Sequence, residues 1–181
     1  MGRSLQLRDG GFAVCIRMED AEDAAELRAI RAVNEAAFGE AAEADLVDQL
    51  RSDGSALISL VAESEASIIG HVLFSRMHIN TASRPIPAVA LAPVAVLPQY
   101  QRNGVGGRLI THGLELLRAR GERIVIVLGH PAYYPRFGFS TEKAALLEAP
   151  FPREAFLAME LVDGALQGVQ GPVLYPPPFG V

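Results

Sequence analysis

A chain of 181 residues, half of them apolar, can bury a substantial core, and this composition excludes an intrinsically disordered protein. The net charge is −5 and no long basic run is present, which argues against nucleic-acid or anionic membrane partners. Cys15 is the only cysteine, and the polar N-terminus lacks an apolar signal core, so we expect a cytoplasmic protein.

The first third of the chain is expected to hold an extension, a strand and two helices. Residues 1–11 resemble an N-terminal extension, and residues 12–181 are expected to form a single domain. Within that domain, 12–17 predict a strand. Asp20 is expected to cap a helix that Gly39 ends, and a second helix is expected over 42–51.

The remaining segments alternate between strand and helix patterns. Residues 57–63 and 67–79 predict a hairpin around a turn at 64–66. A buried strand is expected over 88–97, interrupted by Pro93, then a helix over 105–120 and a strand over 123–128. A strand–helix–strand order predicts a parallel crossover. A short helix or turn at 130–136, a strand at 156–162 and a packed C-terminal loop complete a mixed α/β fold.

The segment QRNGVGG, from Gln101 to Gly107, lies between a predicted strand and a predicted helix. Glycines allow the backbone to approach a ligand closely, and a helix N-terminus offers unpaired N–H groups to a phosphate. A Walker A loop is excluded because Arg108 follows Gly107, and a Rossmann loop because Leu109 replaces its third glycine. The segment therefore predicts a different kind of phosphate-binding loop.

Two motifs resemble those of the GNAT family of acetyl-CoA-dependent N-acetyltransferases. Gln101, Gly104 and Gly106 match its Q/R-x-x-G-x-G/A signature. HPAYYPRFGF, from His130 to Phe139, contains the family's Tyr-x-x-x-Gly-Phe pattern beginning at Tyr134. This stretch resembles a small, mostly uncharacterised bacterial subgroup with a PAYYxRFGF motif, and the resemblance spans roughly residues 12–179.

The resemblance implies a mostly antiparallel sheet with a splayed parallel strand pair and helices on both faces. It also implies direct transfer of an acetyl group, through a tetrahedral intermediate, from acetyl-CoA to a primary amine of a small molecule or peptide. Acetyl-CoA would be a co-substrate, and no metal is expected. The residues expected to contact it are Val94, Ala95, Val96, Gln101, Arg102, Asn103, Gly104, Val105, Gly106, Gly107 and Tyr134.

Acetyl transfer requires stabilisation of an oxyanion and of a departing thiolate. A bulge at Pro93 would leave N–H groups near Val94–Val96 free to stabilise the oxyanion. Tyr134 is the expected acid for the thiolate, with Tyr133 as its competitor. Ordinary phenol and thiol pKa values differ by about 1.5 units, so proton donation would cost roughly 2 kcal/mol.

The residue that deprotonates the amine is not evident, because the strand at 88–97 carries no acid or histidine. The candidates are His71, His78, His130 and Glu35. Cationic side chains that could meet CoA phosphates are Arg102, Arg108 and Arg136. A missing base also favours an alternative, a non-catalytic acyl-CoA binder or sensor. The high apolar fraction further predicts a homodimer that covers exposed apolar surface.

Overall fold

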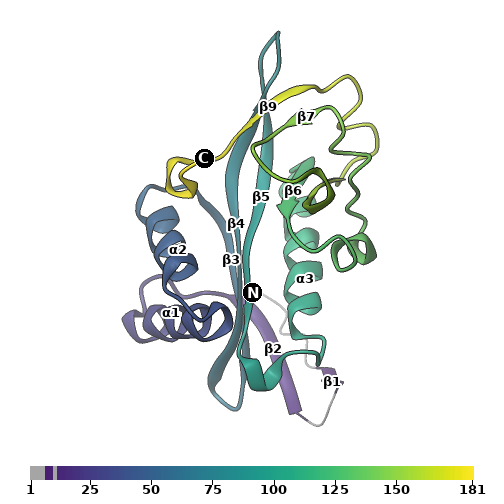
Figure 1. The fold of residues 1–181 in the computed structure, drawn as a ribbon. Coiled ribbons are helices and arrows are strands. Elements are labelled where there is room, and N and C mark those ends of the chain that lie inside the picture. The colour runs from purple at the N-terminus through teal and green to yellow at the C-terminus, as the bar shows by residue number, and fades with distance from the viewer. Residues whose placement is uncertain (1–6, 10–11) are drawn as a thin grey trace. The chain divides into compact units, whose positions relative to one another are not determined.

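The computed structural model describes residues 7–9 and 12–181 (Figure 1). By their Cα positions these residues form two compact units. The first unit runs up to Leu73 and resumes over 93–113, and the second comprises 74–92 and 114–181. Strands β4 (Ser67–Asn80) and β5 (Pro85–Val96) and helix α3 (Val105–Ala119) each pass from one unit into the other.

The strands of the first unit are antiparallel neighbours. Strand β1 (Leu7–Asp9) pairs with β2 (Phe12–Met18), so part of the expected extension is a strand. Strand β2 pairs in turn with β3 (Ala56–Ser64). Strands β3 and β4 are neighbours joined through Glu65 and Ala66, whose φ angles are 48° and 60°. Positive φ at both turn residues is characteristic of a tight two-residue hairpin, which confirms the predicted turn.

Helices α1 (Ala24–Phe38) and α2 (Ala42–Ser52) follow β2. The predicted cap at Asp20 is wrong, because the carboxylate of Asp23 accepts the hydrogen bond from the Ala25 N–H at 2.8 Å. Asp20 instead accepts from the Glu22 N–H and closes the turn before the helix. Aspartates at both positions favour such local bonds, so the sequence alone could not decide between them. Gly39 ends α1 as predicted, at φ 78°.

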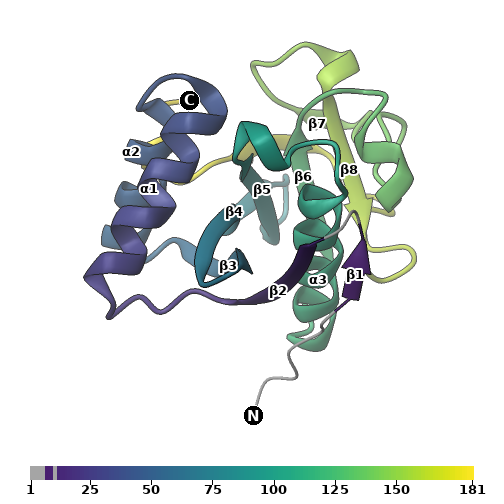
Figure 2. The same cartoon turned by 90° about the horizontal axis from the view of Figure 1, so that it is seen from below.

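Within the first unit, α1 and α3 cover opposite faces of β4 (Figure 2). A Cβ atom on Gly70 would lie 3.2 Å from Val105 and 3.1 Å from Leu109, both on α3. The next residue, His71, is hydrogen-bonded to Asn34 of α1. Successive residues of a strand point to opposite faces, so the two helices must lie on different sides of this strand. The expectation of helices on both faces is confirmed.

The second unit contains the parallel strand pair expected on either side of α3. Strand β5 pairs with β6 (Ile124–Leu128) at Val89–Val125 and Ala90–Ile126, whereas β6 continues to its end in antiparallel register with β8 (Phe156–Glu160). The parallel pairing therefore stops two residues before β6 ends, as expected for strands that diverge there. Strand β5 itself runs unbroken through Pro93, so the predicted interruption is wrong. The fixed φ of proline is compatible with extended backbone and removes only a donor.

The C-terminal segment is more ordered than a packed loop. Strand β9 (Gly171–Leu174) pairs antiparallel with β4, and β7 (Leu147–Glu148) pairs with β9 in parallel. Their side chains join a core with residues of β6 and β8. Short 3₁₀ helices are η1 (Pro98–Tyr100), η2 (Tyr134–Phe137), η3 (Arg153–Ala155) and η4 (Pro177–Phe179). Among the described residues, no helix has the length and apolar character needed to cross a membrane.

Candidate active site

The glycine loop of the first unit is held in shape by its own side chains. The Gln101 side chain donates to the Val96 carbonyl at 3.0 Å, which ties the loop to the end of β5. The Asn103 side chain donates to the Gln101 carbonyl at 3.1 Å. Both amides thus fix the backbone path between strand and helix. The sequence motif predicts both residues at the cofactor, but no local pattern indicates these two hydrogen bonds.

The backbone of this loop is adapted to a close approach by a ligand. Gly104 has φ 79°, and a Cβ atom added there would meet no other atom within 4 Å. Arg102 also has a positive φ, 63°, which is unusual for a residue with a side chain. The Arg108 N–H donates to the Gly104 carbonyl and begins α3. The first N–H groups of a helix lack intrahelical acceptors, so this turn can receive an anion.

The end of β5 precedes the loop. Along Ala92–Val96 the side chains alternate between half-buried and buried, and Ala95 is fully buried. Ala95 can therefore reach a ligand only through its backbone. The Leu97 N–H donates to the Ile69 carbonyl at 2.9 Å, so the chain stays attached to β4 just beyond the strand.

The three arginines proposed for the phosphates occupy different environments. Arg102 is exposed within the loop. Arg108 donates to the Val14 carbonyl of β2 at 2.8 Å, which gives it a structural contact. Arg136 belongs to the second unit, where its guanidinium lies 4.6 Å from the centre of the Tyr133 ring and donates to the Tyr133 carbonyl. Arg102 is therefore the arginine that the first unit presents within the loop itself.

Tyr134 lies in the second unit, just after β6. A Cβ atom on Gly129 would come within 2.1 Å of the Tyr134 ring, so the glycine is required for the ring to occupy this position. The ring packs edge-on against Tyr133 and Phe139 at centroid distances of 5.2 and 5.8 Å. Phe139 is buried, and Gly138, which directly precedes it, has a φ of 99°. The residues of the second motif are thus brought together around one aromatic ring.

Burial raises the pKa of Tyr134 to about 12, and neighbouring Tyr133 adds to the effect. Burial also raises the pKa of Tyr133, although Arg136 opposes that shift. Tyr134 therefore stays protonated at neutral pH and is a weaker proton donor than a tyrosine of ordinary pKa. Against a thiol of pKa about 8.5, the gap is about 3.5 units, or roughly 5 kcal/mol. This corrects the smaller gap expected from ordinary pKa values.

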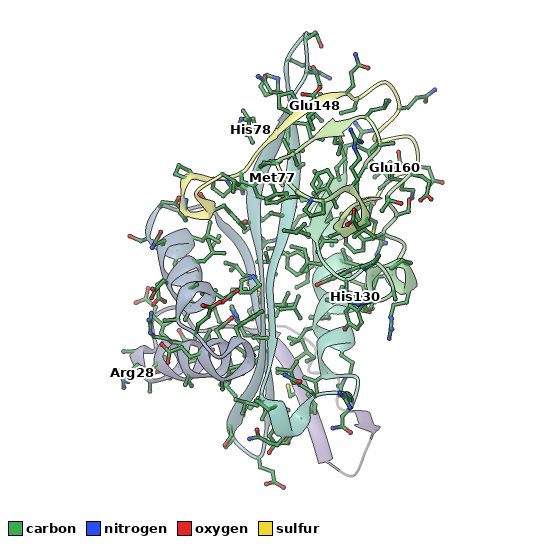
Figure 3. All side chains as sticks on the ribbon, in the orientation of Figure 1. Arg28, Met77, His78, His130, Glu148 and Glu160 are labelled. Carbon is green, nitrogen blue, oxygen red and sulfur yellow. The ribbon has the colours of Figure 1, made fainter. Side chains whose placement is uncertain are left out.

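The four candidate bases are scattered. His71 is completely buried in the first unit, whereas His78 and His130 lie apart in the second unit (Figure 3). The His130 Nδ1 accepts from the Ala132 N–H. Glu35 forms an ion pair with Arg31 at 2.9 Å. The backbone of His130 does meet the tyrosines, because its carbonyl accepts hydrogen bonds from the N–H groups of Tyr133 at 2.9 Å and Tyr134 at 3.5 Å.

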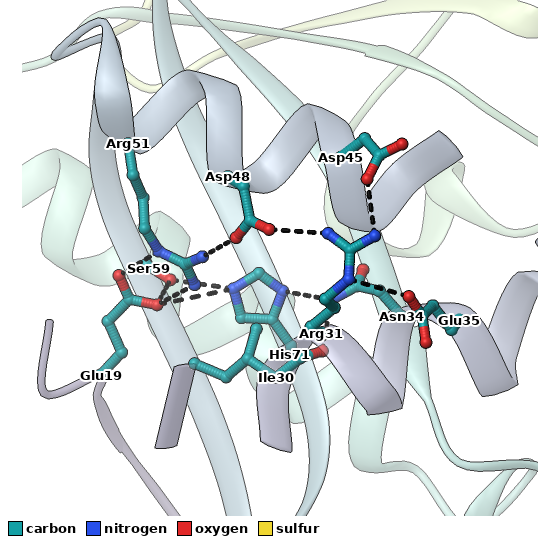
Figure 4. A network of polar contacts seen from close by, with 10 residues as sticks. All are labelled: Glu19, Ile30, Arg31, Asn34, Glu35, Asp45, Asp48, Arg51, Ser59 and His71. Atoms are coloured by element: carbon teal, nitrogen blue, oxygen red, sulfur yellow. Dashed lines mark hydrogen bonds and ion pairs between the residues drawn. The ribbon is translucent and has the colours of Figure 1, made fainter. Parts of the chain in front are cut away.

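His71 belongs to a buried polar network that sequence analysis did not predict (Figure 4). The Asn34 amide donates to the Nδ1 of His71 at 3.1 Å, so Nε2 carries the proton and donates to Ser59 at 2.9 Å. The Ser59 hydroxyl donates to Glu19, whose carboxylate also receives two hydrogen bonds from Arg51. Burial lowers the pKa of His71 to about 3. A neutral, enclosed imidazole with both nitrogens bonded is structural.

Comparisons with known proteins bear on the family of the chain. A family model described as an acetyltransferase (GNAT) domain matches residues 20–141. The uncharacterized N-acetyltransferase YjhQ of Escherichia coli K12 is 45% identical over 130 residues. The match covers 69% of this chain and 72% of the length of YjhQ. The uncharacterized N-acetyltransferase YhbS of the same strain is 38% identical over 141 residues, covering 76% and 83%.

Two solved structures share the fold along almost the whole chain. The crystal structure of E. coli YhbS in complex with CoA superposes with a TM-score of 0.85 at 34% identity, covering 97% of this chain and 96% of its own. A GNAT family acetyltransferase from Brucella melitensis in complex with acetyl-CoA has a TM-score of 0.76 at 34% identity, covering 92% and 97%. The chain therefore belongs to the GNAT family of N-acetyltransferases.

Proposed function

We propose that this protein transfers an acetyl group from acetyl-CoA to a primary amine of a small molecule or peptide. The main support is the braced loop at 101–107, in which Gly104 has a left-handed backbone with open space around it. This loop leads into the N-terminus of α3, where an anion is favoured. Relatives that share the fold were crystallised with CoA and acetyl-CoA.

The chain's own residues have separate tasks in this proposal. The N–H groups of Gly104–Gly107 hold the pyrophosphate, and Arg102 contributes positive charge beside them. The β5–β6 pairing ends at Ala90–Ile126, so backbone N–H groups of Val94–Val96 that do not face β4 stabilise negative charge on the reacting carbonyl oxygen. Acetyl-CoA supplies the acetyl group as an activated thioester. Tyr134, protonated at neutral pH, donates a hydrogen bond to sulfur as negative charge develops there.

The cofactor assignment predicts that Gly104→Asp abolishes binding of acetyl-CoA. Aspartate adds a negative charge where phosphate would lie, and its side chain is strained at φ 79°. Acetyl-CoA should raise the melting temperature of the native protein through mass action, and Gly104→Asp should lose that shift. Gly106→Asp should behave alike.

The matched control is Gly54→Asp, because Gly54 has φ 76° and equally open surroundings but lies in a turn after α2. This variant carries the same strain and charge, and should keep the full thermal shift. A folded Gly104→Asp protein with normal acetyl-CoA affinity would refute the assignment of the loop.

The assignment of Tyr134 predicts that Tyr134→Phe lowers kcat by roughly 10²- to 10⁴-fold, the usual range for a lost acid–base group. The affinity for acetyl-CoA should change little, because the hydroxyl acts mainly after charge has formed. Tyr133→Phe is the matched control and should be milder. The measurement is thiol release with a library of amines. Normal turnover of Tyr134→Phe would remove the tyrosine from the mechanism.

The same assay separates the enzyme from the alternative of a non-catalytic acyl-CoA binder. An enzyme releases thiol in the presence of at least one amine and forms the acetylated amine in equal amount. A sensor binds acetyl-CoA with the expected thermal shift but releases no thiol above the uncatalysed rate.

A further inference from the structure

A groove of about 540 Å³ lies in the first unit between α1 and the β3–β4 hairpin, on the face of the sheet opposite α3. Its volume is within the range of small-molecule sites. The floor is apolar and consists mainly of small side chains, among them Ala25, Ala29 and Ala32 of α1. Such a floor suits the aliphatic part of a slender ligand.

The rim of the groove is negatively charged. Asp23, Glu26 and Glu63 border it together with a single cation, Arg17. The guanidinium of Arg17 forms a two-pronged ion pair with Glu26, at 2.7 and 3.0 Å, and also contacts Glu63 at 2.8 Å. One positive charge faces three carboxylates, so the rim keeps a net charge of about −2 at neutral pH. Charge complementarity therefore favours a cation.

The groove reaches the end of β5, where the proposed transfer takes place. Leu97 borders the groove and directly follows Val96, the last residue of β5. The glycine loop leads from this strand end to α3, on the other face of the sheet. A donor held by the loop and an acceptor held in the groove would therefore approach the same strand end from opposite faces.

We propose that this groove binds the acceptor, and that the acceptor is an aliphatic diamine or longer polyamine. This inference rests on the proposed function and names its substrate class. One amine is acetylated at the end of β5, the methylene stem lies on the alanine-rich floor, and the second ammonium group meets the carboxylates at the rim.

The test compares diaminobutane with butylamine, which has the same stem and a single charge. In the native protein kcat/KM should be about fivefold higher for the diamine, because a partly exposed ion pair contributes up to about 1 kcal/mol. The preference should weaken at high ionic strength, as expected for partly exposed charges.

Asp23→Asn with Glu63→Gln removes two carboxylates with little structural change. Asparagine caps helices as well as aspartate does, and Arg17 retains its paired contact with Glu26. This double variant should raise KM for the diamine, leave KM for butylamine unchanged and leave kcat unchanged. Glu154→Gln, an exposed acid of the second unit, controls for a general change of charge and should keep the native preference.

Direct binding distinguishes this proposal from the proposed function. Calorimetry of diaminobutane with the CoA-saturated protein should give an affinity that the double variant loses and Glu154→Gln keeps. If the diamine binds in this way but no amine releases thiol, the transferase assignment fails and the groove assignment survives. Equal kcat/KM for both amines, or equal diamine affinity in the native protein and the double variant, would overturn the groove assignment.

Discussion

At the scale of single residues, the position of Tyr134 depends on the absence of a side chain at Gly129. The nearest ring atom would lie only 2.1 Å from a Cβ atom at this position, and two further ring atoms at 2.7 and 3.0 Å. The ring is rigid and packs against Phe139, so it cannot yield as a flexible chain end would. The glycine is therefore part of the catalytic arrangement proposed above.

Gly129→Ala should displace the Tyr134 ring. We expect a loss of stability of about 1–3 kcal/mol from overpacking and a fall in kcat on the order of 10²-fold from the misplaced hydroxyl. Chemical denaturation and thiol release measure the two effects. In a Tyr134→Phe background, the same alanine should still destabilise the fold but should slow turnover little further. Full additivity of the two kinetic effects would show that Gly129 acts independently of the hydroxyl.

At the scale of secondary-structure elements, the buried network holds α1 and α2 against β3 and β4. His71 contributes from β4, Asn34 from α1, Ser59 from β3 and Arg51 from α2. Burial opposes ionisation of Glu19, but hydrogen bonds from Arg51 and Ser59 outweigh it and lower the pKa of this carboxyl. The network thus stabilises the charged form of Glu19 and the neutral form of His71.

Folding should therefore become less favourable as the pH falls through the histidine range. The pKa of His71 is lowered to about 3 in the folded protein. Below the ordinary histidine pKa, the unfolded chain therefore binds a proton at His71 that the folded chain does not bind. The free energy of unfolding should drop by about 2 kcal/mol between about pH 7.5 and about pH 5 from this residue alone. The window lies above the range where carboxylates of lowered pKa titrate.

Urea unfolding at both pH values checks this. His71→Gln should be less stable than the native protein at neutral pH but should lose this part of the acid dependence. His78→Gln is the matched control, since His78 is an exposed histidine on the same strand, and it should keep the native pH profile. An unchanged profile in His71→Gln would mean that His71 is protonated in the folded state.

At the scale of the whole molecule, we predict a homodimer. The second unit exposes Leu146 and Leu174 at 59% and 41% of their surfaces. Leu174 ends β9, and the Leu146 carbonyl accepts a hydrogen bond from the Gly171 N–H at the start of that strand. A second copy would cover such apolar surface. Light scattering should give twice the monomer mass at micromolar concentration, and Leu146→Asp should shift the protein towards monomer. A native monomer at high concentration would disprove the prediction.

Features that depend on neighbouring residues could be predicted from the sequence. The helix after the glycine loop, the hairpin at Glu65–Ala66 and the stop at Gly39 follow from local backbone preferences and periodicity. The two motifs carried the family assignment, because their residues are close together in the chain. The N-cap of α1 could not be predicted in the same way, since Asp20 and Asp23 satisfy the same preference.

Features that depend on distant residues were decided only by the tertiary structure. Strand β9 forms because its backbone pairs with β4, almost a hundred residues earlier in the chain. Only a glycine is accommodated at position 171, because a Cβ atom there would collide with the Asn80 carbonyl. The sequence leaves His71 as a candidate base, but side chains from neighbouring elements enclose it in the folded chain. Its burial, like the raised pKa of Tyr134, follows from long-range packing that no local pattern records.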